Sequence, residues 1–196
     1  MQGRLERVVL DGKPGPTFDG AYGFEFSADS SRFAYMAQVQ TNWWMVVDGK
    51  LEQEVNMGSS RPYFSPEGKR LAYIAGRGPM YWMMVDGRPG PKFKGILWRT
   101  NFLLKDEEEV PPFTRPRFSP DSSHVAYSAR EGAKWILVFD NRRVGGNYDM
   151  FVSNGPSFHE EGSLEMLGIR DGVLYRLVGK LKSDTKGSSA RRGKSW

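Results

Sequence analysis

The sequence of 196 residues contains no cysteine and only two histidines. Without cysteine, the chain can form no disulfide and no zinc–thiolate site. No apolar run reaches the roughly 18 residues that a membrane-spanning helix needs, and the first residues lack the apolar block of a secretory signal. We therefore expect a soluble, cytoplasmic protein without a metal or cofactor, and no association with a membrane.

The net positive charge is confined to one end of the chain. The net charge is +5, but residues 180–196 hold six basic residues and one acidic residue, so the remainder is balanced. A balanced body lacks the basic footprint of a duplex-binding domain. The end itself is rich in Ser, Gly, Lys and Arg, which predicts a flexible basic tail. Its contact with nucleic acid and a purely solubilising role both stay open.

Glycine and proline are abundant, at 23 and 12 residues, and they punctuate an internal repeat. Three segments match closely and a fourth matches weakly; they begin at Phe24 (FEFSADSSRFAYMA), Pro62 (PYFSPEGKRLAYIA), Pro116 (PRFSPDSSHVAYSA) and Pro156 (PSFHEEGSLEMLGI). A second motif accompanies them, with its aspartate at Asp11, Asp48, Asp86 and Asp140. The repeat is about 38 residues long, with one insertion of about 16 between Phe93 and Thr114.

Each repeat predicts four short strands. Phe26-Ser27 and its equivalents end a strand, and the Asp-, Ser- and Gly-rich segment that follows is typical of a turn. Next come an alternating strand, such as RFAYMAQV, and an aromatic strand that ends in Asp-Gly, a strong hairpin signal. A polar strand such as KLEQEV completes the unit. Four strands in about 40 residues make one blade of a β-propeller.

The pattern F-S-P-[DE]-[GS]-x-x-[LV]-A-Y-x-A resembles the WD-repeat-like blades of the TolB type, over roughly residues 4–179. The resemblance implies an all-β propeller of four or five four-stranded blades, a bacterial origin and a role in binding proteins. We place the propeller domain at 1–179, with repeats near 24–56, 62–96, 116–152 and 156–179, an insertion at 97–113 and the basic tail at 180–196.

The two ends of the domain raise the question of ring closure. The first residues, LERVVLDGKPGPTFDG, read as third- and fourth-strand material that precedes the first full repeat. We expect the strand at Leu5–Leu10 to be paired, and we favour closure of the ring within the chain. A fifth, partial blade and completion by a second chain are the alternatives, so the protein is either a monomer or a homodimer.

Catalytic patterns are weak. The chain has no G-x-S-x-G elbow, which a serine hydrolase of the related peptidase type needs. We interpret His124 as a solvated turn residue, His159 as a capping residue, and the recurrent aspartates as turn formers. The leading hypothesis is therefore a non-catalytic scaffold that binds a protein partner. One alternative is an enzyme or binder of a small polar or sugar-like ligand at the axis, using Glu25 and His159; another is a module of a larger propeller assembly.

Two regions supply the candidate binding residues. The first strands of a propeller line its axis, and the repeat alignment places Glu25, Tyr63, Arg117 and Ser157 at one position there. Arg61 and Arg115 each precede a proline at a strand start, where two arginines favour an anionic group. The insertion is the second region, expected as a loop that docks a partner through Trp98, Phe102, Asp106, Glu107, Glu108 and Glu109.

Overall fold

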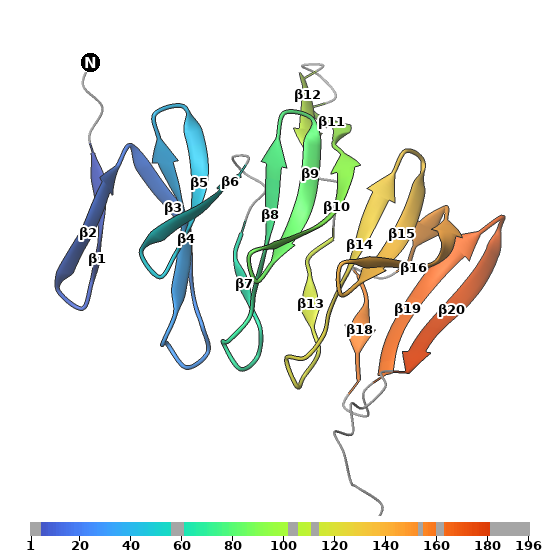
Figure 1. The fold of residues 1–196 in the computed structure, drawn as a ribbon. Coiled ribbons are helices and arrows are strands. Elements are labelled where there is room, and N and C mark those ends of the chain that lie inside the picture. The colour runs from blue at the N-terminus through green and yellow to red at the C-terminus, as the bar shows by residue number, and fades with distance from the viewer. Residues whose placement is uncertain are drawn as a thin grey trace, which may run out of the picture.

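The computed structural model describes residues 5–55, 61–101, 106–110, 114–152, 155–159 and 163–180. All regular structure in these ranges is β-strand, and they contain no helix long and apolar enough to cross a membrane. Four antiparallel four-stranded sheets follow one another along the chain and stand side by side in a row (Figure 1). The prediction of about four four-stranded propeller blades is therefore confirmed.

The strands fall into four blades and two hairpins. The N-terminal hairpin is β1 (Glu6–Leu10) and β2 (Lys13–Phe18). The first blade is β3 (Gly20–Phe26), β4 (Phe33–Val39), β5 (Asn42–Val47) and β6 (Lys50–Val55). The second is β7 (Tyr63–Phe64), β8 (Leu71–Arg77), β9 (Met80–Val85) and β10 (Arg88–Lys94). The inserted hairpin is β11 (Ile96–Asn101) and β12 (Asp106–Val110). The third blade is β13 (Arg117–Phe118), β14 (Val125–Glu131), β15 (Lys134–Phe139) and β16 (Arg142–Tyr148). The fourth is β17 (Met150–Phe151), β18 (Ser157–Phe158), β19 (Ser163–Arg170) and β20 (Val173–Lys180).

The predicted hairpin turns form between the third and fourth strands of the blades. Asp86 and Gly87 have φ angles of 51° and 72°, and Asp48 and Gly49 have 49° and 80°. Two consecutive residues with positive φ define the type I′ turn, whose twist matches the flanking strands. Aspartate tolerates this region better than most side chains, and glycine adopts it without steric cost.

The hydrophobic core lies between blades. In β8, Tyr73 and Ala75 pack toward the first blade, whereas Ala72 and Ile74 pack toward the third. Successive side chains of a strand point to opposite faces, so this second strand is buried on both faces. The same stacking joins the N-terminal hairpin to the first blade through Phe18 and joins the third blade to the fourth.

The N-terminal strand is paired, but its partner differs from the one that we favoured. β1 pairs with β2 alone, and the hairpin packs on the first blade. The hairpin and β19–β20 lie at opposite ends of the row (Figure 1). Closure of the ring within the chain is therefore wrong: the core behind Phe18 fixes the hairpin to the first blade, far from the last one.

The insertion also differs from the expected loop, because its backbone forms the hairpin β11–β12. The register places Trp98 opposite Glu108 and Arg99 opposite Glu107. The run Ile96-Leu97-Trp98 contains residues that favour strands. Phe102 lies outside the described residues, and the structure gives no side-chain environment for Trp98 or for Asp106, Glu107, Glu108 and Glu109. Their role in docking a partner stays a prediction.

Candidate functional site

The turn after the first strand of each of the first three blades is held by a buried serine. Ser27 and Ser119 are 3% and 1% exposed, and the Ser27 Oγ accepts a hydrogen bond from the backbone N–H of Arg32 at 3.0 Å. The same hydroxyl donates to Asp29 at 2.6 Å. This bond, with those from Ser31, lowers the pKa of Asp29 from 3.8 to about 2. Asp121 has its pKa lowered to about 2 in the same way, chiefly by Ser119. Asp29 and Asp121 thus close their turns, as predicted.

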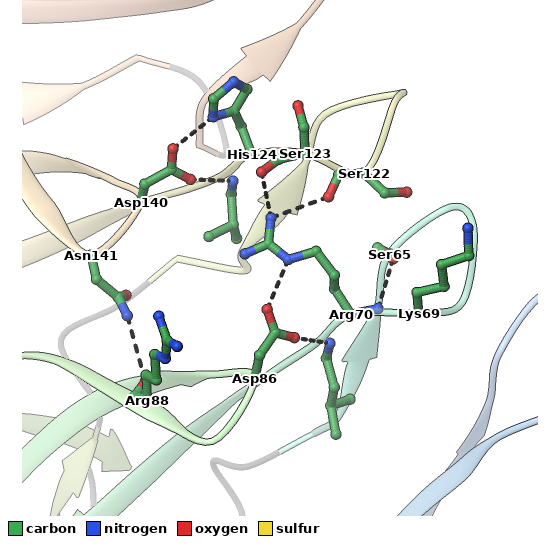
Figure 2. A network of polar contacts seen from close by, with 12 residues as sticks. Ser65, Lys69, Arg70, Asp86, Arg88, Ser122, Ser123, His124, Asp140 and Asn141 are labelled. Carbon is green, nitrogen blue, oxygen red and sulfur yellow. Dashed lines mark hydrogen bonds and ion pairs between the residues drawn. The ribbon is translucent and has the colours of Figure 1, made fainter. Parts of the chain in front are cut away.

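An arginine connects each of the first two blades to the blade that follows. Arg70 Nε donates to Asp86 Oδ2 at 2.8 Å within the second blade, and its Nη1 donates to the carbonyl oxygens of Ser122 and Ser123 in the third (Figure 2). Asp86 Oδ1 also accepts the backbone N–H of Leu71. In the first blade, Arg32 bonds Asp48 and reaches the carbonyl of Lys69.

His124 occupies the position of these arginines in the third blade. Its Nδ1 lies 2.6 Å from Asp140 Oδ2 (Figure 2). Its ring centroid lies 5.0 Å from that of Phe139. The histidine side chain is only 27% exposed. Its interpretation as a solvated turn residue is therefore wrong, because the aspartate of the hairpin turn holds it against the blade.

The first strands of three successive blades surround one hollow of about 540 Å³. Residues from the first strands and from the segments beside them form its wall. They are Glu25, Phe26, Ala28, Arg61, Pro62, Tyr63, Phe64, Ser65, Pro66, Arg115, Pro116, Arg117 and Phe118. The structure thus brings together five of the six residues nominated for the mouth and axis. His159 is not part of this wall.

The hollow is basic and aromatic. Arg115 lies over the ring of Tyr63, with its Cζ 5.2 Å from the ring centroid and its Nε 3.4 Å from the hydroxyl. Arg61, Arg115 and Arg117 are all exposed, and none forms an ion pair with a carboxylate of the described residues. Glu25 is the single acidic residue of the wall. Among the described residues, the hollow therefore offers three guanidinium groups without an ion-pair partner beside aromatic faces.

Two buried prolines position two of these arginines. Arg61 precedes Pro62 and Arg115 precedes Pro116, and both prolines are buried at the start of a first strand. A residue before proline is biased to the extended region, so the chain enters each strand in a fixed direction. The two arginines occupy equivalent repeat positions in adjacent blades. Both therefore lie on the wall of the same hollow.

His159 lies on the fourth blade, away from this wall. Its Nε2 is 3.5 Å from Glu165 Oε2, and Arg176 bonds the same carboxylate oxygen at 2.7 Å. Arg176, with a smaller contribution from His159, lowers the pKa of Glu165. Glu25 and His159, the pair suggested for acid–base chemistry at the axis, are therefore not brought together at the hollow. Within the described ranges, no group of three His, Cys, Asp or Glu side chains forms a cage for a metal ion.

Two features of this region were not predicted from the sequence. Phe26, Phe64 and Phe118 line the hollow, and of these Phe64 and Phe118 also pack at blade junctions. The pairing of a basic residue with the hairpin aspartate was also not predicted, although the sequence contains a signal for it. Arg32, Arg70 and His124 each precede the aspartate that they contact by 16 residues. A cation at a constant spacing from a turn aspartate, repeated three times, would have identified the pairs.

Comparisons with known proteins give fold-level likeness only. No protein-family model matches the chain, and no curated protein matches it. TolB from Acinetobacter baumannii aligns over 91% of this chain and 47% of its own, with 12% identity and a TM-score of 0.43. The β-propeller domain of Myceliophteria thermophila Cps50 (Swd1) aligns over 81% of this chain and 50% of its own, with 10% identity and a TM-score of 0.37. The chain thus spans about half the length of these solved propellers.

Proposed function

We propose that the protein is a non-catalytic binding scaffold whose hollow receives an acidic segment of a partner protein. The observation that carries this proposal is the set of three arginines, Arg61, Arg115 and Arg117, on the wall of one hollow, none of which forms an ion pair with a carboxylate of the described residues. Other arginines of the chain, such as Arg32, Arg70 and Arg143, are paired with acids. An unpaired cluster at a concave surface is suited to an external anion.

The chemistry of the wall favours carboxylates on a peptide. The planar guanidinium group matches the two oxygens of a carboxylate. Tyr63 holds Arg115 in place through its ring and hydroxyl, so less side-chain entropy is lost when the anion binds. Phe26, Phe64 and Phe118 add apolar surface, which a peptide covers and a simple anion does not. The hollow spans three blades, which provides room for several residues of an extended chain.

The test is binding of a fluorescein-labelled glutamate peptide, followed by fluorescence anisotropy. We expect saturable binding that weakens as salt rises, because the contacts are exposed to solvent. The double variant Arg61→Ala/Arg117→Ala should weaken binding by about tenfold or more, in proportion to the loss of two charge-assisted contacts. A labelled lysine peptide should not bind the hollow.

Arg77→Ala is the matched control, since Arg77 is exposed at the end of β8 and lies outside the hollow. It removes one positive charge and should change binding by less than about twofold. Equal losses in Arg77→Ala and in the Arg61 or Arg117 single variants would reduce the effect to net charge and overturn the proposal. Competition by inorganic phosphate as strong as by unlabelled peptide would assign the hollow to a simple anion.

A further inference from the structure

The wall of the hollow divides into an acidic part and a basic part. Among the described residues, Glu25 of β3 in the first blade is its one acid. Arg61 precedes the first strand of the second blade, and Arg115 and Arg117 belong to the entry of the third. Glu25 is exposed, and its carboxylate takes part in none of the ion pairs formed within the described ranges. An anion that enters the hollow therefore meets a like charge on the side of the first blade.

The register of the first blade shows which way Glu25 points. Glu25 pairs with Ala34 on the neighbouring strand β4, and paired residues of an antiparallel ladder lie on the same face of the sheet. Ala34 packs in the core between the first and second blades, together with Leu71 and Tyr73. The carboxylate of Glu25 is therefore on the face of the first blade that meets the second blade.

The repeat places Arg61 on the other side of this junction. Tyr63 has the place of Glu25 in the second blade, since it pairs with Ala72, which packs toward the third blade. Arg115 of the third blade lies over the Tyr63 ring, and Arg61 corresponds to Arg115 because each precedes the buried proline of its blade. Glu25 and Arg61 thus stand on the two sides of the first junction, but no ion pair of the described chain joins them. Both charged groups are open to a ligand.

Resting on the proposed function, we infer that Glu25 is a specificity-determining residue, which selects an acidic segment with an arginine at one end. The guanidinium group of the ligand pairs with Glu25, while its carboxylates reach Arg61 and Arg117. A glutamate or aspartate in place of that arginine is repelled, so the same contact rejects a purely acidic segment. Opposite charges at the two ends of the hollow also fix the direction in which the segment lies.

The experiment is a competition, followed by fluorescence anisotropy, between unlabelled peptides with blocked ends and the labelled glutamate peptide. One peptide carries an arginine before a run of glutamates, and a second carries it after the run. Each has a partner in which glutamine replaces the arginine. Net charge alone favours the glutamine peptides, because they are more negative and the hollow is basic. The inference reverses this order: one of the two arginine peptides should bind about two- to fivefold more tightly than its glutamine partner, as an exposed ion pair provides.

Glu25→Gln removes the acid and should abolish this preference, so that the glutamine peptide binds at least as tightly as the arginine peptide. Glu52→Gln is the matched control, since Glu52 is exposed on the outermost strand of the same blade and lies outside the hollow. The control should keep the full preference. Circular dichroism should show both variants folded, because each replaces an exposed side chain of nearly the same shape.

Three results would overturn the inference and leave the proposed function intact. They are equal or weaker binding of both arginine peptides relative to their glutamine partners, a preference that survives Glu25→Gln, and a Glu25→Gln variant that binds all peptides more tightly by the same factor. The last result would show that Glu25 only offsets the charge of Arg61. Binding of the glutamate peptide that is unchanged in Arg61→Ala/Arg117→Ala would instead overturn the proposed function, and this inference with it.

Discussion

Arg70 Nε lies 2.8 Å from Asp86 Oδ2, and this ion pair holds the guanidinium where its other nitrogen bonds the third blade. Arg70 therefore stabilises both its own blade and the junction with the next blade. Within its own blade it closes the hairpin turn, and between blades it fixes the second blade to the turn of the third (Figure 2). The equivalent contact of Arg32 with Asp48 and Lys69 shows that the repeat encodes the junction as well as the blade.

We predict that Arg70→Lys lowers the free energy of unfolding by about 1–2 kcal/mol, because an ammonium group cannot keep the aspartate and both carbonyl contacts. Urea unfolding measures this change. Arg77→Lys is the control, since Arg77 is exposed and forms no ion pair with the described residues, and it should be neutral. Identical stabilities of the two variants would contradict a role for Arg70 in joining blades.

The lowered pKa values of Asp29 and Asp121 predict a loss of stability in acid. Both values fall from 3.8 to about 2 in the folded protein, so the unfolded chain binds protons first as the pH drops. The stabilisation is complete above about pH 4 and disappears as the pH falls toward about 2. Melting temperatures measured across this window should fall less steeply in Asp29→Asn/Asp121→Asn than in the wild type.

Ser27→Ala and Ser119→Ala should act on the same window, because each removes the hydroxyl that contributes most to the lowered pKa of its aspartate. Each variant also leaves a backbone N–H, of Arg32 or His124, without its acceptor, which costs about 1–2 kcal/mol. Ser157→Ala is the control on an exposed serine of a first strand. An acid profile unchanged in both serine variants would mean that these hydrogen bonds do not determine the two pKa values.

Gly87 tests backbone strain without steric conflict. Its φ is 72°, and a Cβ built there meets no atom within 4 Å. Gly87→Val should therefore destabilise by about 1–2 kcal/mol through the conformational penalty alone. Gly87→Asn should recover most of the loss, because asparagine tolerates positive φ. Thermal melting compares the two, and a valine variant as stable as the wild type would show that the turn rearranges.

Gly90 tests the opposite case. Its φ lies outside the left-handed region, but a Cβ would stand 2.7 Å from the Tyr127 hydroxyl and 2.8 Å from Asn141 Oδ1 across the junction of the second and third blades. Gly90→Ala should destabilise by about 1–3 kcal/mol as the blades are forced apart. Gly179→Ala is the control, since its Cβ would find only ordinary contact with Leu164 at 3.8 Å. Equal melting temperatures would contradict the close approach.

Phe18 tests whether the N-terminal hairpin is part of the folded unit. It is 5% exposed and its ring packs edge-on against Tyr35, with 6.1 Å between centroids. Phe18→Ala should cost about 3 kcal/mol of unfolding free energy, as truncation of a buried aromatic residue does. Leu51→Ala, on an exposed residue, is the control. A neutral Phe18→Ala would mean that the hairpin contributes nothing to the first blade.

The blade itself was predictable because its signals are local. The Phe-Ser strand ends, the Asp-rich turns and the Asp-Gly hairpins lie within a few residues of one another, and their backbone geometry depends on those residues alone. The equivalence of Glu25, Tyr63 and Arg117 was also predictable, since a repeated unit puts equivalent residues at equivalent places. The prediction that the Asp-Gly pairs form hairpin turns is confirmed at Asp48-Gly49 and Asp86-Gly87, where both residues have positive φ.

The structure of the insertion and the pairing of the N-terminal strand were harder to predict. The hairpin β11–β12 has no counterpart in the other repeats, so no internal comparison informs it. The N-terminal strand reads equally well as the missing strand of the last blade or as the start of a partial first one. Its local sequence is the same in both cases, and only its long-range packing differs.

The sequence by itself determined the strands, their turns and their order, because these depend on propensities and periodicities within about 40 residues. Only the tertiary structure decided which residues meet across blades: that His124 replaces an arginine beside Asp140, that Arg115 rests on Tyr63, and that Phe18 fixes the hairpin to the first blade. The physical reason is that burial between sheets depends on how whole blades pack against each other. Each such interface is formed by residues from two repeats, so the sequence of one repeat does not determine it.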